Sequence, residues 1–228
     1  MSLSISQLNR DDLLLVALRL IPGARSLDLP ALEANINAAE AARATLASAD
    51  ATVHGAQADK DAAVQALATA EETAANHASA LVLLLKSMVR VEVPGAAELL
   101  QRCQTACTAT QLRRKGAGRL PGLIALREAL DSAPTSPARR MVEESVAAFV
   151  TVTDEMQSAL TARDKLAYAL STAIAAANEA ESAAAAALSQ LRRQVALETG
   201  GETSALYQRW KAPVNGLVSG RAARKTAA

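Results

Sequence analysis

The chain has 228 residues, and alanine and leucine dominate it with 55 and 31 residues, against one Phe, two Tyr and one Trp. Alanine and leucine are among the best helix formers, whereas the β-branched and aromatic residues that suit a pleated sheet are scarce. This composition excludes a β-sandwich, a β-barrel and most doubly wound α/β folds. A chain that is 50% hydrophobic is also not disordered as a whole. The formal net charge of +1 divides unevenly, since residues 1–110 carry 8 basic and 12 acidic side chains and residues 111–228 carry 16 and 11.

The sequence predicts two successive sets of three helices, and each set consists of a short helix, a long helix and a second short helix. The first set is expected over residues 9–21, 30–93 and 96–114, with the long stretch closing at Pro94-Gly95. After a glycine-rich linker at 116–122, the second set is expected over 120–130, 137–199 and 202–211. Proline suits the first turn of a helix, so Pro30 and Pro137 open the long stretches, with Asp28 and Ser136 as the expected caps. The remaining residues, 212–228, are expected to form a flexible basic tail.

A sequence repeat underlies this order. Residues 80–103 align with 187–210 at a constant offset of 107. The identical pairs are Ala80/Ala187, Leu81/Leu188, Leu84/Leu191, Leu99/Leu206, Gln101/Gln208 and Arg102/Arg209. Self-similarity at a fixed spacing is typical of duplicated units. We therefore predict an all-α, Ala-rich antiparallel helical bundle built from two tandem repeats of about 107 residues, with long helices and short flanking helices. The repeats are residues 1–114 and 115–211, packed into the same bundle.

Both long stretches carry rows of residues spaced on average about 3.5 apart, as in left-handed bundles and coiled coils. In the first stretch one row reads Leu32, Ala39, Leu46, Val53, Lys60, Leu67, Ala74, Leu81, Met88, and the other reads Asn35, Ala42, Ala49, Ala56, Ala63, Ala70, His77, Leu84, Val91. The second stretch continues the pattern through Val142, Phe149, Met156, Leu160, Arg163, Ala167, Leu170, Ile174, Ala177, Leu188 and Val195. Alanines also lie off these rows, at 34, 38, 41, 44, 62 and 66. Because a two-helix coil would leave those alanines without a partner, we expect further helices to cover them.

The path of each long stretch stays open at this point. A helix of about 60 residues far exceeds the usual length. Residues 50–55, Asp-Ala-Thr-Val-His-Gly, are a run of weak helix formers, and Thr161-Ala-Arg-Asp164 resembles a capping sequence. Lys60 and Arg163 also place charge in the rows nearby. These features favour a hairpin in each stretch, near 50–57 and 157–164, whereas the continuous rows favour single helices.

No motif for nucleophilic catalysis, phosphate binding or dinucleotide binding occurs in the sequence. The only histidines, His54 and His77, have no Glu three residues before them, and two cysteines are too few for a closed metal site. At the offset of 107, Cys103 and Cys107 align with Trp210 and Val214, so we interpret both as small core side chains. We expect no enzyme activity, no metal and no cofactor.

Positive charge gathers in five places, around residues 113–119, at 139–140, at 192–193, at 209–211 and in the tail at 221–225. Phosphates bind to such clusters by charge neutralisation, but the nearly neutral net charge and the lack of interleaved aromatic residues disfavour a nucleic acid. The candidate contacts to an anion or a partner are Arg113, Arg114, Lys115, Arg119, Arg192, Arg193, Arg221, Arg224 and Lys225.

The sequence gives no indication of export or of a membrane span. The first residues lack a basic segment followed by an apolar run, and the longest apolar run is only residues 81–85. Two cysteines four residues apart on a helix are poorly placed to form a disulfide. We therefore expect a cytoplasmic protein without a transmembrane helix.

These features predict a non-catalytic helical-bundle scaffold, adaptor or self-assembling structural protein that acts through helix–helix contacts with a protein partner or a second copy. Trp210 beside Tyr207 is interpreted as an anchor of the last helix on the bundle. The alternative function is attachment to an anionic or apolar surface, such as a nucleic acid, a membrane or a storage granule, through the basic clusters and the tail.

Overall fold

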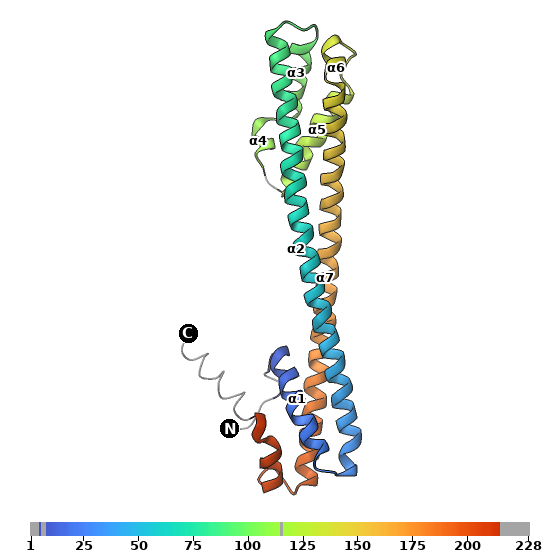
Figure 1. Cartoon of the computed structure of the whole chain (residues 1–228), viewed down its shortest axis with the longest axis vertical. Helices are drawn as coiled ribbons and strands as arrows, with labels where there is room; N and C mark the ends of the chain where they lie inside the picture. The colour runs from blue at the N-terminus through green and yellow to red at the C-terminus, as the bar shows by residue number, and fades with distance from the viewer. Residues whose placement is uncertain (1–4, 6–7, 115, 215–228) are drawn as a thin grey trace, which may run out of the picture. The chain divides into compact units, whose positions relative to one another are not determined.

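The computed structural model describes residue 5 and residues 8–114 and 116–214. It is 86% helical, and the described residues include no strand, so the all-α prediction is confirmed (Figure 1). The chain divides into two compact units. Unit 1 comprises Met1–Ala56 with Leu170–Ala228, and unit 2 comprises Gln57–Ala169. Each unit therefore contains parts of both predicted repeats, and this division leaves the repeat of 107 residues a prediction.

The two long helices are continuous. Helix α2 covers Glu33–Arg90 and α7 covers Glu143–Glu198. The prediction of hairpins near 50–57 and 157–164 is therefore wrong. The buried row continues on both sides of each suspected turn, with Leu46 and Leu67 buried on α2. A weak helix former costs about 1 kcal/mol or less. The helical hydrogen bonds and the burial on either side outweigh that cost.

Unit 1 packs two short helices on the first part of α2 and the last part of α7. Helix α1 covers Arg10–Arg25, the 3-10 turn η2 covers Pro30–Leu32, and a last helix runs over residues 205–214. The Asn9 side chain caps α1 by accepting the Asp12 backbone N–H. Trp210 Nε1 donates to the Leu20 carbonyl at 3.0 Å, which confirms that this residue anchors the last helix. The fully buried side chains of the unit include Leu13, Leu20, Ile21, Leu32, Leu46, Leu191, Val195 and Tyr207.

Unit 2 places α3, Ala96–Ala106, and α5, Leu120–Asp131, against the last part of α2 and the first part of α7. The shorter connections are α4 (Ala109–Leu112), η3 (Gly116–Gly118) and α6 (Pro137–Met141). The fully buried side chains include Leu81, Leu85, Cys103, Leu123, Leu126, Leu130, Phe149 and Met156.

The expected caps of the long stretches have different outcomes. The Ser136 hydroxyl accepts the Arg139 backbone N–H at 3.1 Å, so this cap is confirmed. Asp28 adopts φ 51° instead, and η2 begins after Leu29 without a side-chain cap. Asp28 lies in a left-handed turn and Leu29 occupies the N-cap position, so the cap predicted at Asp28 is wrong. Gly95 opens α3 at φ 83°, where a Cβ would lie 2.6 Å from Ser136 Cβ, so this turn requires glycine.

Burial along α2 follows the predicted row. All members of the row from Leu32 to Met88 are buried except Val53 and Lys60, which are half-buried. On α7 the predicted row is not buried throughout, because its members Ala167 and Ile174 are exposed. The off-row alanines at 34, 38, 41, 44, 62 and 66 are also exposed, so the expectation that further helices cover them is wrong. The covering helices have only 16, 11 and 12 residues in α1, α3 and α5, against 58 in α2.

Gly55 lies inside α2, and a Cβ built on it meets nothing within 4 Å. Replacing Gly55 with alanine is therefore expected to raise the free energy of unfolding by about 0.5–1 kcal/mol, because alanine loses less conformational entropy in a helix. Urea denaturation followed by circular dichroism measures the change. The matched control is Ala58→Gly at an exposed helical position, which should lower stability by a similar amount. A loss of stability in Gly55→Ala would contradict a continuous α2.

Candidate functional site

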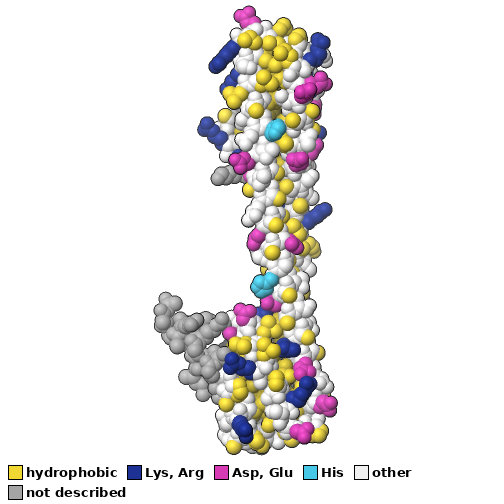
Figure 2. All heavy atoms as spheres, viewed as in Figure 1, with side chains coloured by type: hydrophobic (Ala, Val, Ile, Leu, Met, Phe, Trp, Pro, Cys, Tyr) yellow, Lys and Arg dark blue, Asp and Glu magenta, His cyan; other side chains and the backbone are white. Residues whose placement is uncertain are grey.

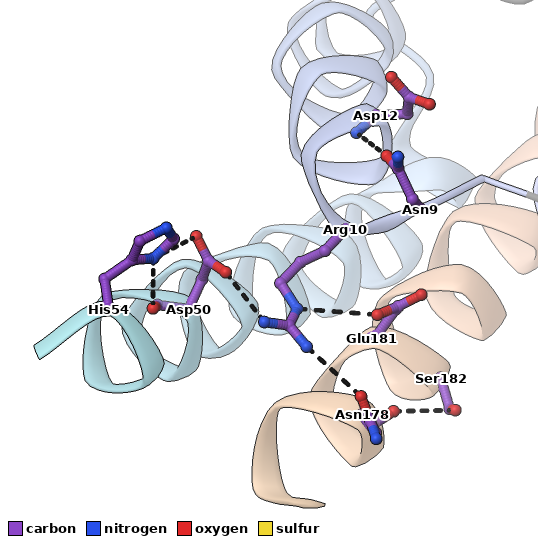
Figure 3. Close-up of polar contacts among 8 residues, drawn as sticks. All are labelled: Asn9, Arg10, Asp12, Asp50, His54, Asn178, Glu181 and Ser182. Atoms are coloured by element: carbon purple, nitrogen blue, oxygen red, sulfur yellow. Dashed lines mark hydrogen bonds and ion pairs between the residues drawn. The ribbon is translucent and has the colours of Figure 1, made fainter. Parts of the chain in front are cut away.

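A polar cluster that joins three helices lies in unit 1, where α1 begins (Figure 3). The guanidinium of Arg10 extends from α1 toward both long helices. Its Nη1 lies 3.0 Å from Asp50 Oδ1 on α2, and its Nη2 lies 3.4 Å from Asn178 Oδ1 on α7. Its Nε lies 3.7 Å from Glu181 Oε2 and is buried without a hydrogen-bond partner. One cation therefore bridges two carboxylates and joins three helices.

His54 extends this cluster outward along α2. Its Nδ1 lies 2.9 Å from the Asp50 carbonyl oxygen and 3.5 Å from Asp50 Oδ2 (Figure 3). The imidazole is 76% exposed, which leaves it in solvent rather than in an enclosed cavity. The Asp50 carboxylate is already engaged by the Arg10 guanidinium. The geometry is that of a joint between helices, and it offers no enclosed acid–base pair.

The basic residues predicted as contacts do not form one surface. Arg113 and Arg114 follow α4 in unit 2 and are exposed, and Arg193 is exposed on α7 in unit 1. Two others are engaged inside the fold. Arg119 Nη1 donates to the Glu71 carbonyl at 2.9 Å, and Arg192 bonds Tyr207 Oη and Glu202 Oε1, both at 2.8 Å. Lys115, Arg221, Arg224 and Lys225 lie outside the described residues.

The two thiols belong to the core of unit 2, as the alignment with Trp210 and Val214 predicts. Cys103 and Cys107 are both buried and unpaired. Gly122 makes room for Cys107, since a Cβ at that position would lie 3.1 Å from Cys107 Sγ. Within the described part of the chain, no group of three His, Cys, Asp or Glu side chains could hold a metal ion. The described helices also include none that is long and apolar enough to cross a membrane.

Burial of Cys103 has a measurable consequence for stability. Removal from water raises the pKa of its thiol from 9.0 to about 11, with a smaller contribution from nearby Cys107 and an opposing one from a backbone hydrogen bond. Between pH 9 and 11 the unfolded chain loses this proton first, so the stabilising contribution is complete below pH 9 and declines as pH rises through that window. The free energy of unfolding in urea, measured from pH 8 to 10.5, should fall more steeply with pH in the wild type than in Cys103→Ala. Parallel pH profiles would contradict the burial.

Comparison with protein-family models, curated proteins and solved structures finds no match to this chain. The Arg10 cluster was missed in the sequence because its members are 40 and 168 positions apart, and no local spacing links them. The only local signal is that Arg10 follows a capping Asn9 at the start of a short helix.

Proposed function

We propose that this chain is a non-catalytic scaffold or adaptor of the cytoplasm that acts through contacts between its helices and those of a protein partner or a second copy. The proposal rests mainly on the exposed alanines of α2, which lie at residues 34, 38, 41 and 44 in unit 1 and at residues 62 and 66 in unit 2. Small side chains let a partner helix approach closely, so an exposed alanine face suits helix docking.

Large apolar side chains at the surface support the same proposal. Hydrophobic side chains reach the visible face among polar ones (Figure 2). The exposed members include Leu18, Leu83, Val91, Met141, Tyr168, Leu197 and Leu206. Single exposed apolar residues are normal on a protein surface. Their combination with uncovered alanine rows on a long helix is what favours a helical partner.

The use of polar side chains inside the fold also supports a non-catalytic role. Arg10, Arg119 and Arg192 join helices of their own unit, and the two thiols fill core positions. The proposal assigns these groups to stability and the uncovered helix faces to binding.

Attachment to an anionic surface is the second candidate, and the exposure of Arg113, Arg114 and Arg193 favours it. Binding by such residues depends on charge neutralisation and weakens steeply with salt. Helix docking through alanine and apolar side chains does not weaken in this way.

A capture experiment separates the two candidates. Immobilised chain is exposed to purified untagged chain, to a lysate of the native host, to duplex DNA and to anionic vesicles at about 0.1 M and about 1 M salt, which span weak and strong screening. The proposal predicts capture of a second copy, or of a helical protein partner from the native host, at both salt concentrations. Capture of DNA or vesicles alone, lost at high salt and lost in the triple variant Arg113→Ala, Arg114→Ala, Lys115→Ala, would contradict it and support surface attachment.

A further inference from the structure

A shallow groove runs along one face of α7 in unit 2. Its lining residues, called here the α7 strip, are Asp154, Gln157, Ser158, Thr161, Ala162 and Lys165. They recur at spacings of three and four, so they lie on one side of the helix. All six are exposed, whereas Phe149, Thr153 and Met156 of the same helix are buried. The groove is open to solvent, with a volume of about 580 Å³, and its central side chains, Ser158, Thr161 and Ala162, are small.

The α7 strip is complementary to itself in the antiparallel direction. Counted outward from the midpoint between residues 159 and 160, Ser158 matches Thr161, Gln157 matches Ala162, and Asp154 matches Lys165. When two copies of a surface meet across a two-fold axis, each residue contacts its match on the other copy. Antiparallel strips would therefore place small residues at the centre and an acid opposite a lysine at both ends.

The charges at the two ends are available for such a contact. Asp154 Oδ1 accepts from Arg127 Nη1 at 2.6 Å, and the Asp154 side chain is still 55% exposed. Arg127 comes from α5 and lies beside the acidic end of the strip. Lys165 is exposed at the other end. Arg127 already neutralises Asp154 in part. We therefore expect an ion pair between Asp154 and a lysine of a second copy to contribute only modestly to the stability of the dimer.

The exposed side chain of Tyr168 is a second, independent observation that favours a contact surface at the α7 strip. Of the four aromatic residues of the chain, Phe149, Tyr207 and Trp210 are buried, whereas Tyr168 is 76% exposed. It lies three residues beyond Lys165, on the same side of α7, and its antiparallel match is the exposed Thr151. Tyrosine is enriched among the residues that carry most of the binding energy of protein interfaces. Its exposure beside a groove with charged ends indicates a contact surface.

We propose that the α7 strip is the interface of an antiparallel dimer of this chain, with Asp154 paired to the partner's Lys165 and Tyr168 packed over the partner's Thr151. This inference rests on the proposed function and specifies a second copy as the helical partner. The two-fold axis passes between Ser158 and Thr161, where small side chains let the two helices approach.

A charge exchange tests the pairing. Lys165→Glu places an acid opposite Asp154 twice in the dimer, and we expect the dissociation constant from sedimentation equilibrium to rise at least tenfold. Asp154→Lys should weaken the dimer similarly. The double variant Asp154→Lys, Lys165→Glu restores opposite charges between copies, since the two positions are eleven residues apart on one helix. It also replaces the Arg127 ion pair of Asp154 with a repulsion, so it should recover only part of the affinity that each single variant loses. Tyr168→Ala should also weaken the dimer at least tenfold.

The matched control is Lys86→Glu at an exposed lysine of α2 in the same unit, which should leave the dissociation constant within twofold. Circular dichroism melting verifies that each variant folds. A wild-type dimer that Lys165→Glu and Tyr168→Ala leave unchanged would overturn the α7 strip while the proposed function stands on another surface. A wild-type monomer would overturn the dimer, and the capture experiment then decides the proposed function separately.

Cysteine cross-linking provides a second test that does not depend on charge. A mixture of Ser158→Cys and Thr161→Cys chains should form a disulfide-linked dimer under mild oxidation, faster than either variant alone. The native thiols of Cys103 and Cys107 are buried and should not contribute. Equal rates in the mixed and separate samples would overturn the antiparallel register.

Discussion

Replacing Phe149 with alanine is expected to lower the free energy of unfolding by about 3–5 kcal/mol. The Phe149 side chain is fully buried on α7, in the cluster that also contains Leu85, Cys103, Leu126 and Met156. Truncation removes the ring from this cluster and leaves a cavity that the surrounding helices fill only in part. The effect is large because α3 and α5 hold to the long helices of unit 2 through this one apolar core.

Urea denaturation followed by circular dichroism measures this loss, and hydrogen exchange locates it. Protection should fall most in α3, α5 and the parts of the long helices that belong to unit 2. Leu83→Ala is the matched control, because Leu83 is 64% exposed on α2 and its truncation should change stability by less than about 0.5 kcal/mol. Equal effects of the two substitutions would contradict the described core.

Replacing Trp210 with alanine should destabilise unit 1 by a similar amount, about 3–5 kcal/mol. The indole is buried and donates from Nε1 to the Leu20 carbonyl at 3.0 Å. Its ring centroid lies 5.6 Å from that of Tyr207. Gly23 admits the indole, since a Cβ there would lie 3.1 Å from Trp210 Cδ1. Without the indole, α1 and the last helix lose this hydrogen bond and the packing around it, and keep the bond from Arg19 Nη1 to the Pro213 carbonyl at 2.9 Å.

Two controls separate packing from hydrogen bonding at this position. Trp210→Phe keeps an aromatic ring and loses the donor, so it should cost less than the alanine substitution. Leu206→Ala truncates a 55% exposed side chain of the same helix and should be nearly neutral. Circular dichroism is the readout, because the chain has one tryptophan and its fluorescence disappears with it. A Trp210→Ala protein as stable as Leu206→Ala would rule out the anchor.

The sequence predicts much of the fold because the helical signals are local. Alanine and leucine content, the row from Leu32 to Met88 and the cap at Ser136 each depend on neighbours within a few turns. The hairpins were predicted wrongly because weak helix formers at 50–55 have no intrinsic power to break a helix whose flanks are buried. Coverage of the off-row alanines was predicted wrongly because composition does not state which face lacks a partner.

The repeat stays a prediction, with observations on both sides. Arg10 and Arg119 both stand at the start of a short helix, and each donates to a residue of α2 and leaves a buried Nε without a hydrogen-bond partner. Asn178, which Arg10 contacts, lies 107 positions after Glu71, which Arg119 contacts. Against this, the aligned pair Leu99 and Leu206 differs, since the first is buried and the second is exposed.

The candidate site was the least predictable part. Clusters of arginine and lysine mark positive charge, but the sequence does not state which of these side chains the fold itself uses. Arg119 and Arg192 bond within their own units, whereas Arg113, Arg114 and Arg193 remain exposed. The α7 strip is made of ordinary polar and small residues, and only their common exposure and spacing distinguish it.

Sedimentation equilibrium of the unmodified chain over a wide range of concentration tests the central claim most directly. The chain has a mass of 23.6 kDa. If its helix faces exist to bind other helices, the measured mass should rise reversibly to twice this value with concentration, and the rise should persist in high salt. A mass that stays at that of one chain throughout, together with no captured helical partner, would contradict the account.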